Sequence, residues 1–237
     1  MALNTKLYQN AYAQYRADLQ QAAQWTHADY SHNGITRERA RRIVEARKKL
    51  QAKIPGALQP ETLADTRPKV LDGLAPKSAD QVSLVQHDWG TVQAALTSGR
   101  SLQQVVVEAT SAERLAAIAA NAEAWAYGQN TNDPAGVAAD IRAMVYDRLV
   151  EIGYEPAVSA NATNQQFAAH QAWHEVMTEA LGTGQTLATV SGLHKADPDG
   201  YKAFATANAD FDPSGDVGRT VAHIDGLVGS GQMKLEG

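Results

Sequence analysis

The stretch SADQVSLVQHDWGTVQAALTSGRSLQQVVVEATSAERLAAIAANAEAWAYG, residues 78–128, decides the fold class. Ser78 and Thr110 each stand three residues before a Gln or Glu, which is the capping-box pattern that satisfies free amides at a helix start. Gly99 and Gly128 each follow an apolar run, as the glycines that end helices do. The stretch therefore predicts helices at 79–98, 102–108 and 112–127.

The same signals continue on the C-terminal side of this stretch. Asp133–Pro134 fits an N-cap followed by proline at the first helical position, and Thr163 begins another capping box that ends at Gln166. Gly153 and Gly182 follow the next two apolar runs. We expect helices at 134–152 and 164–181, and short helices at 198–209 and 217–227.

Residues 5–54 predict a helical hairpin. Apolar residues of the first half repeat at alternating spacings of four and three, as in a heptad seam, at Tyr8, Tyr12, Tyr15, Leu19 and Ala22. The sequence SHNG at 31–34 interrupts this helix, since Asn–Gly favours left-handed turns. We expect Thr36 to cap a second helix that runs to about Lys53 and is ended by Pro55–Gly56.

Four ranges differ in composition and define the expected organisation. After the hairpin (1–54), residues 55–78 hold four prolines and two glycines among scattered leucines, which predicts a linker or docking arm. Residues 79–182 form the expected helical core domain. Residues 183–237 form a Gly- and Asp-rich, partly irregular extension. No pair of segments alternates as paired strands do, so the sequence predicts an all-α protein.

The composition indicates a globular protein without cysteine chemistry. Of the 237 residues, 44% are hydrophobic and 20% are charged, a balance that argues against wholesale disorder. The absence of cysteine excludes disulfides, thiolate zinc sites and cysteine nucleophiles. The formal charge of -5 gives no general attraction to nucleic acid or anionic lipid. No run approaches the roughly 18 apolar residues of a membrane span, and no signal peptide is visible. These features predict a cytoplasmic protein, or one within a particle assembled in the cytoplasm.

The stretch FAAHQAWHEVMTEAL, residues 167–181, carries the most metal-like pattern. His170 and His174 stand one helical turn apart, so both rings can reach the same point. On a helical wheel both histidines fall among apolar residues, whereas Glu175 falls on the polar side and cannot share their ligand sphere. The favoured interpretation is a pair of hydrogen-bonded histidines in a packing face, and a metal site with a third ligand from elsewhere is the alternative.

The stretch DFDPSGD, residues 210–216, resembles the first half of an EF-hand calcium loop. Asp210, Asp212 and Ser214 take positions 1, 3 and 5 of that pattern. The bidentate glutamate of position 12 is missing, because Val221 stands there. The favoured interpretation is a turn before a short helix, and a weak, incomplete calcium site is the alternative.

The helix expected at 37–53 is basic, although the protein is acidic. Arg39, Arg42, Lys49 and Lys53 fall within about 80° of one another on a helical wheel and form a positive stripe. Such a stripe can hold the phosphates of nucleic acid or an acidic patch on a partner protein. The simplest interpretation is a solvated helix face with local pairs to glutamates, since no DNA-binding motif accompanies it.

No motif indicates a particular enzyme. The chain has no dinucleotide fingerprint, Walker A motif, G-x-S-x-G or H-E-x-x-H, and no cofactor is expected. The favoured hypothesis is a non-enzymatic helical structural or assembly protein that contacts other protein chains. It would act as a homo-oligomer or as a component of a bacterial or phage particle (capsid-associated, scaffold-like or head–tail). The alternatives are a metal-dependent helical enzyme using His170 and His174, and a nucleic-acid-binding accessory protein using helix 37–53. No membrane partner is expected.

Overall fold

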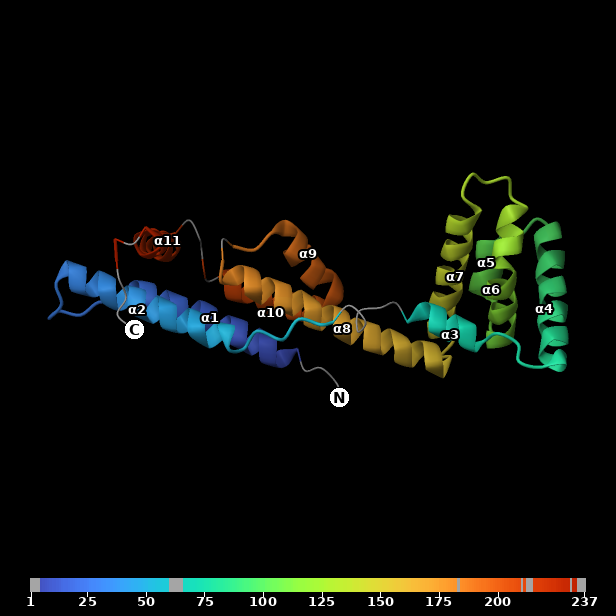
Figure 1. Cartoon of the computed structure of the whole chain (residues 1–237), viewed down its shortest axis with the longest axis horizontal. Coiled ribbons are helices and arrows are strands. Elements are labelled where there is room, and N and C mark those ends of the chain that lie inside the picture. The colour runs from blue at the N-terminus through green and yellow to red at the C-terminus, as the bar shows by residue number, and fades with distance from the viewer. Residues whose placement is uncertain are drawn as a thin grey trace. The chain divides into compact units, whose positions relative to one another are not determined.

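The computed structural model describes residues 5–59, 66–182, 184–209, 211, 215–230 and 232–233. All regular structure in these residues is helical, so the expected all-α class is confirmed. Eleven helices fall in these ranges and are labelled in Figure 1: α1 (Lys6–Gln24), α2 (His32–Gln51), α3 (Arg67–Gly73), α4 (Ala79–Thr97), α5 (Leu102–Glu108), α6 (Ala112–Tyr127), α7 (Pro134–Glu151), α8 (Glu155–Ala180), α9 (Leu187–Ala196), α10 (Pro198–Ala209) and α11 (Asp216–Gly229).

Contacts within the chain divide it into two units. Unit 1 consists of residues 1–62 and 166–237, and unit 2 of residues 63–165. The sequence ranges 1–54, 55–78, 79–182 and 183–237 group the chain differently. The reason lies in α8, whose buried Trp173 and Met177 belong to the same apolar cluster as the cores of α1 and α2. Helix periodicity reports an apolar face and does not report which other face covers it.

The core of unit 1 forms along the hairpin of α1 and α2, which lie side by side in Figure 1. Tyr12 and Leu19 of α1 and Ile43 and Leu50 of α2 are almost completely buried, at positions where the sequence repeats an apolar face. The two helices run antiparallel. Contacts near the loop join Arg39 to Trp25, and contacts further along the hairpin join Lys49 to Asp18.

A single carboxylate ties α8 to α10 within unit 1. Trp173 of α8 is fully buried, and its Nε1 donates a hydrogen bond of 2.9 Å to Oδ2 of Asp197. The other oxygen of Asp197 accepts from the backbone N–H of Gly200 at 2.8 Å in the first turn of α10. A Cβ on Gly200 would collide with the carboxylate of Asp197, so this close approach favours glycine.

Unit 2 has a core made almost entirely of aliphatic side chains. Its buried residues lie on four consecutive helices, α4 to α7, and on the start of α8. The largest of them are Val92, Leu102, Val105, Val106, Leu115, Ile118, Ile141, Val145, Tyr146 and Leu149. Trp89 and Trp125 are only half-buried and pack against the edge of this core, whereas Trp173 in unit 1 is fully buried.

The Pro-rich range 55–78 is used by both units. Residues 55–59 lie against α8 in unit 1, where Leu58 N–H donates to Gln171. Val70, Leu71 and Leu74 pack on the core of unit 2. The two ends of this range therefore contact different units, the first through backbone hydrogen bonds and the second through apolar side chains.

Helix α8 begins nine residues before the expected start at 164. Thr163 lies inside the helix, where its hydroxyl donates to the carbonyl oxygen of Ser159 at 2.9 Å instead of capping a new helix. Serine and threonine can occupy a helix interior in this way. The expected capping box at Thr163 is therefore wrong. Helix α9, at 187–196, has no counterpart among the expected helices.

Two further expectations about helix ends are corrected. Helix α2 begins at His32 because the side chain of Ser31 accepts from Gly34 N–H at 3.2 Å, so Thr36 does not cap it. Gly128 has a φ of -76°, and Asn130 adopts the left-handed conformation instead, with a φ of 50°. The expectation holds at Gly99 and Gly153, whose φ angles are 92° and 78°.

Candidate functional site

His170 joins three segments of unit 1 through both of its ring nitrogens. Its Nδ1 lies 2.9 Å from the hydroxyl of Tyr8 on α1, and its Nε2 lies 2.8 Å from the carbonyl oxygen of Gly56. A carbonyl oxygen only accepts, so Nε2 carries the proton and Nδ1 accepts from Tyr8. Burial raises the pKa of Tyr8, which keeps its hydroxyl protonated as this donor. His170 itself is 8% exposed, as the helical wheel predicts.

His174 contacts the same segment one turn further along α8. Its Nδ1 lies 2.7 Å from the carbonyl oxygen of Pro55, so Nδ1 donates this hydrogen bond. We call Tyr8, His170, His174 and the backbone of Pro55–Gly56 the histidine clasp. The clasp joins α8 to α1 and to the segment that directly follows the hairpin.

The expected metal ligands are therefore engaged in hydrogen bonds. Both nitrogens of His170 have partners, so a metal ion there would have to displace Tyr8 or Gly56. Among the described ranges, no group of three or more His, Asp or Glu side chains is arranged to hold a metal ion. Asp210, Asp212 and Ser214, the expected calcium ligands, lie outside the described residues.

The expected positive stripe on α2 is largely occupied by intramolecular contacts. Arg39 donates from Nε to the carbonyl oxygen of Trp25 at 2.8 Å. Arg42 donates to Glu38 at 2.8 Å and lies 5.1 Å above the ring of Trp25. Hydrogen bonds from Arg41 and Arg42 lower the pKa of Glu38 to about 2. These arginines hold the end of the hairpin together.

The other two residues of the stripe border a groove between α1 and α2. The groove has a volume of about 620 Å³, and Tyr8, Ala11, Ala46 and Leu50 form much of its apolar lining. Leu7 stands at its side with 65% of its surface exposed. We call this hollow the hairpin groove.

The charged border of the hairpin groove is positive. Lys49 lies 3.4 Å from Asp18 and 3.6 Å from Glu45, which neutralise it. Lys53 is exposed and makes no ion pair with the described part of the chain. An apolar hollow beside an uncompensated lysine suits an apolar segment that carries an acidic residue.

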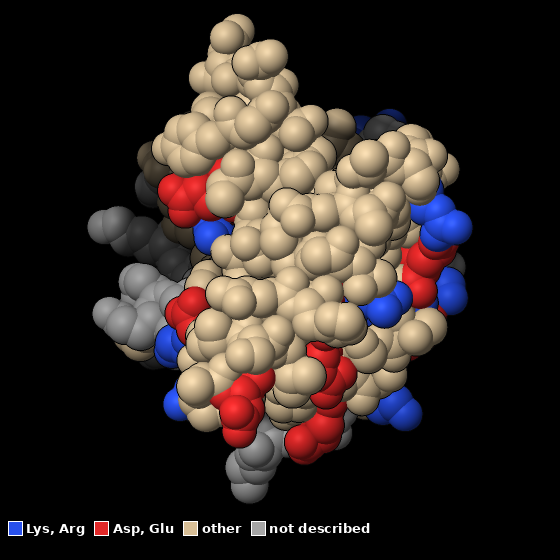
Figure 2. Space-filling view, turned by 90° about the vertical axis from the view of Figure 1, so that its right-hand side faces the viewer, with Lys and Arg blue, Asp and Glu red and all other residues tan. Residues whose placement is uncertain are grey.

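Unit 2 presents an apolar surface of its own along α4. Only Val92 is buried among the 19 residues of this helix, while Val82 and Leu84 are 40% and 58% exposed. Figure 2 shows the side of unit 2 that contains α4 as a broad uncharged area interrupted by a few charged side chains. Asp80, in the first turn of α4, is exposed and has no ion-pair partner among the described residues.

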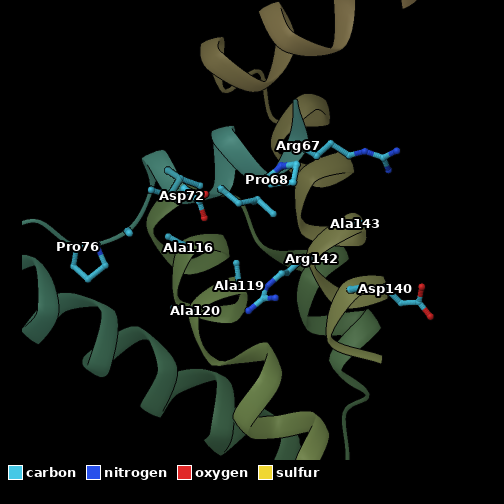
Figure 3. A pocket seen from close by; sticks show the side chains of 14 residues that line it. Arg67, Pro68, Asp72, Pro76, Ala116, Ala119, Ala120, Asp140, Arg142 and Ala143 are labelled. Carbon is cyan, nitrogen blue, oxygen red and sulfur yellow. The ribbon is translucent and has the colours of Figure 1, made fainter. Parts of the chain in front are cut away.

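A groove of about 650 Å³ extends this apolar surface over α3, α6 and α7. Figure 3 shows Ala116, Ala119 and Ala120 of α6 facing it, with the Arg142 side chain reaching in from α7 and Asp140 pointing away. Arg142 is paired with Glu123 at 3.9 Å. A smaller hollow, of about 270 Å³, shares Leu74 and Ala116 with this groove and reaches Leu84. The alanines that line the larger groove permit close approach of another chain.

Neither surface could be read from the sequence pattern. Leu7 lies next to Tyr8, outside the repeating apolar positions of α1. An apolar residue outside that repeat is the one sign in the sequence that points to this groove. Leu84 lies next to Val85, and periodicity cannot tell which of the two a neighbouring helix covers. The basic stripe did indicate α2, and two of its four residues border the hairpin groove.

No described helix combines the length and apolar character that a bilayer crossing requires. Comparison of the chain with protein-family models, curated proteins and solved structures finds no match.

Proposed function

We propose that this protein is a helical assembly protein whose copies join head to tail. The hairpin groove of one copy receives the exposed face of α4 from the next copy. Such a protein acts through its surfaces and needs no cofactor. The observation that carries the proposal is the presence on one chain of an apolar groove bordered by Lys53 in unit 1 and an exposed apolar helix with Asp80 in unit 2.

The charges of the two surfaces favour contact between unlike ends. Residues 1–54 contain ten Lys and Arg against four Asp and Glu, whereas residues 63–165 contain seven against twelve. Two hairpins, or two copies of unit 2, would repel each other, and one of each would attract. A symmetric contact between two hairpin grooves is therefore disfavoured.

The apolar residues of the two surfaces supply the rest of the contact. Leu84 projects from α4 and is available to enter the hairpin groove beside Leu7. Asp80 precedes Leu84 by about one turn on the same face of α4 and supplies a counter-charge for Lys53 of the other copy. Burying exposed leucines at the centre of an interface contributes more than the charges at its rim, which mainly select the partner.

A head-to-tail contact has a consequence for the assembly. Each copy keeps one groove and one α4 face free, so the contact repeats until a ring closes or a filament grows. This behaviour suits a component of a larger bacterial or phage particle.

Two single substitutions test the contact. Leu7→Asp places a charge in the groove, and Leu84→Asp places one on α4, so each variant should be monomeric at concentrations where wild type associates. The two variants mixed in equal amounts should form a dimer and nothing larger, because the intact groove of Leu84→Asp takes the intact α4 of Leu7→Asp. Sedimentation velocity and light scattering measure both results.

Leu187→Asp is the matched control. Leu187 is 85% exposed on α9 and lines neither surface, so this variant should associate as wild type does. Wild type that stays monomeric at high protein concentration in low salt would exclude self-assembly. A dimer that forms from wild type but not from the mixed variants would replace the head-to-tail contact with a symmetric one.

A further inference from the structure

A pocket of about 570 Å³ opens within unit 1 between α1, α10 and α11. Among the residues that the structure describes, its charged lining consists of Arg16, Arg47 and Asp225. Two guanidinium groups and one carboxylate give this described lining a net positive charge. None of the residues of the histidine clasp and neither Leu7 nor Leu84 lines it.

Aromatic rings and polar groups hold the Arg16 guanidinium in place. Its Cζ lies 4.6 Å from the ring centre of Phe211 and 5.2 Å from that of Tyr12. Its Nε donates to the hydroxyl of Tyr12 at 2.9 Å, and its Nη2 donates to Gln185 Oε1 at 3.3 Å. The Tyr12 hydroxyl also accepts from Gln185 and donates to Asn208, so all its hydrogen-bonding positions are in use.

The charge of Arg16 is not neutralised by the described part of the chain. No carboxylate of these residues lies within ion-pair distance of Arg16, and Nη1 makes no hydrogen bond to them. An anionic ligand at this half-buried guanidinium would gain a charge attraction that no described carboxylate competes for. The free edge of the guanidinium, formed by its two Nη atoms, matches the two oxygens of a carboxylate.

Arg47 takes up the carboxylate of Asp225. Its two Nη atoms donate to Asp225 at 2.6 and 2.7 Å, and this hydrogen bonding raises the pKa of Arg47. The Nε of Arg47 is buried and has no hydrogen-bond partner. Asp225 is therefore fully committed to Arg47 and leaves the charge of Arg16 for a ligand.

We propose that this pocket binds a small aliphatic carboxylate. The carboxylate accepts hydrogen bonds from the Nη edge of Arg16, and the tail lies against the apolar wall formed by Leu19, Val190 and Val221. The apolar wall favours a carboxylate with a tail over inorganic phosphate, which has no apolar part to bury.

Binding of four probes to the wild-type protein tests the ligand class. Hexanoate should bind, as measured by calorimetry and by a shift of the Arg16 Nε–H resonance in the NMR spectrum. Acetate should bind at least about 10-fold more weakly, because four fewer CH₂ groups are buried. Hexanol, which has the tail without the charge, and inorganic phosphate, which has charge without the tail, should each bind at least about 10-fold more weakly than hexanoate.

The variant Arg16→Lys keeps the positive charge and removes the planar fork. It should weaken hexanoate binding by about 10-fold and remove the shifting resonance. Arg37→Lys, an exposed arginine of α2 outside the pocket, is the matched control and should bind as wild type does.

Three results would overturn the proposal. Equal affinities for hexanol and hexanoate would show that the charge of Arg16 contributes nothing to ligand binding. Phosphate binding as tight as hexanoate binding would show that the apolar wall contributes nothing to ligand affinity. Absence of hexanoate binding to wild type would exclude the site altogether, whether or not Arg16→Lys folds.

Discussion

The two units of this protein are held together in different ways. In unit 1, polar side chains join segments that are far apart in the sequence: Tyr8 and His170 are separated by 162 residues, and Tyr12 and Asn208 by 196. In unit 2, helices pack mainly through aliphatic faces, and its hydrogen bonds include a buried one from Tyr146 to Ala157 across 11 residues and one from Asn164 to Thr66 across 98. Helices that are close in sequence can pack through their periodic apolar faces. Segments that are far apart in sequence must also find particular side chains to bind, which the periodicity does not specify.

Removing the central residue of unit 1 should have the largest effect. Trp173 is fully buried, donates to Asp197 and lies 6.2 Å from the Tyr12 ring. Trp173→Ala leaves a cavity and an unpaired carboxylate oxygen, so we expect a loss of about 3–5 kcal/mol in the free energy of unfolding of unit 1. Hydrogen exchange followed by mass spectrometry reports this loss in α1, α2 and α10.

The matched change in unit 2 is Leu149→Ala. Leu149 is also fully buried, and its truncation should cost about 2–5 kcal/mol in α4 to α7. If each variant lowers protection in its own unit only, the two units unfold independently. Loss of protection in both units from either substitution would contradict the contrast and make the chain one cooperative unit.

The same contrast explains what could be predicted from the sequence. Helices α4 to α7 of unit 2 were predicted nearly residue by residue, because Ser78, Asp133 and Gly99 are local signals that act on their own helix. Helix α3, in the Pro-rich range, was not predicted. The capping box at Thr110 was displaced by one residue, since Ser111 is the cap of α6. Local signals place helix ends, and they leave the pairing of distant faces open.

In unit 1 the sequence predicted faces but not partners. The helical wheel placed His170 among apolar residues, and it is buried. Its partners, Tyr8 and Gly56, lie 162 and 114 residues away, and no periodicity connects them. The sequence therefore predicted that His170 and His174 form hydrogen bonds, and only the tertiary structure identifies the groups that they bind.

Breaking the histidine clasp should have an intermediate effect. His170→Phe retains an aromatic ring but removes the acceptor of the Tyr8 hydroxyl and the donor to Gly56. Because both groups lose a partner, unit 1 should be destabilised by about 1–3 kcal/mol. The segment around Pro55 should become a site of rapid cleavage in limited proteolysis. His194→Phe, at an exposed histidine beside Tyr201, is the control and should change neither property.

Zinc titration of the same variant separates the clasp from the metal hypothesis. Hydrogen bonds alone predict that Zn²⁺ leaves the melting temperature of wild type unchanged. A zinc-dependent rise in wild type that His170→Phe and His174→Phe both abolish would establish the two histidines as metal ligands.

The smallest expected effect is a pH dependence located in the hairpin. Hydrogen bonds from Arg41 and Arg42 lower the pKa of Glu38 from 4.5 to about 2 in the folded protein. A lowered folded-state pKa stabilises the protein at pH values above the unfolded pKa, and this contribution disappears as the pH falls from about 4.5 to about 2. Arg41 and Arg42 are 61% and 41% exposed, so solvent screening limits the contribution to about 1 kcal/mol.

The measurement is the difference in unfolding free energy between wild type and Glu38→Gln across this pH range. The difference should be about 1 kcal/mol at pH 6 and should approach zero at pH 2, because protonated Glu38 and glutamine both lack the charge. Glu45→Gln is the control: Glu45 is 53% exposed and lies 3.8 Å from Arg41, so its difference should be smaller throughout. A Glu38 difference that stays constant from pH 6 to pH 2 would show that the arginines bind Glu38 equally well in its neutral form.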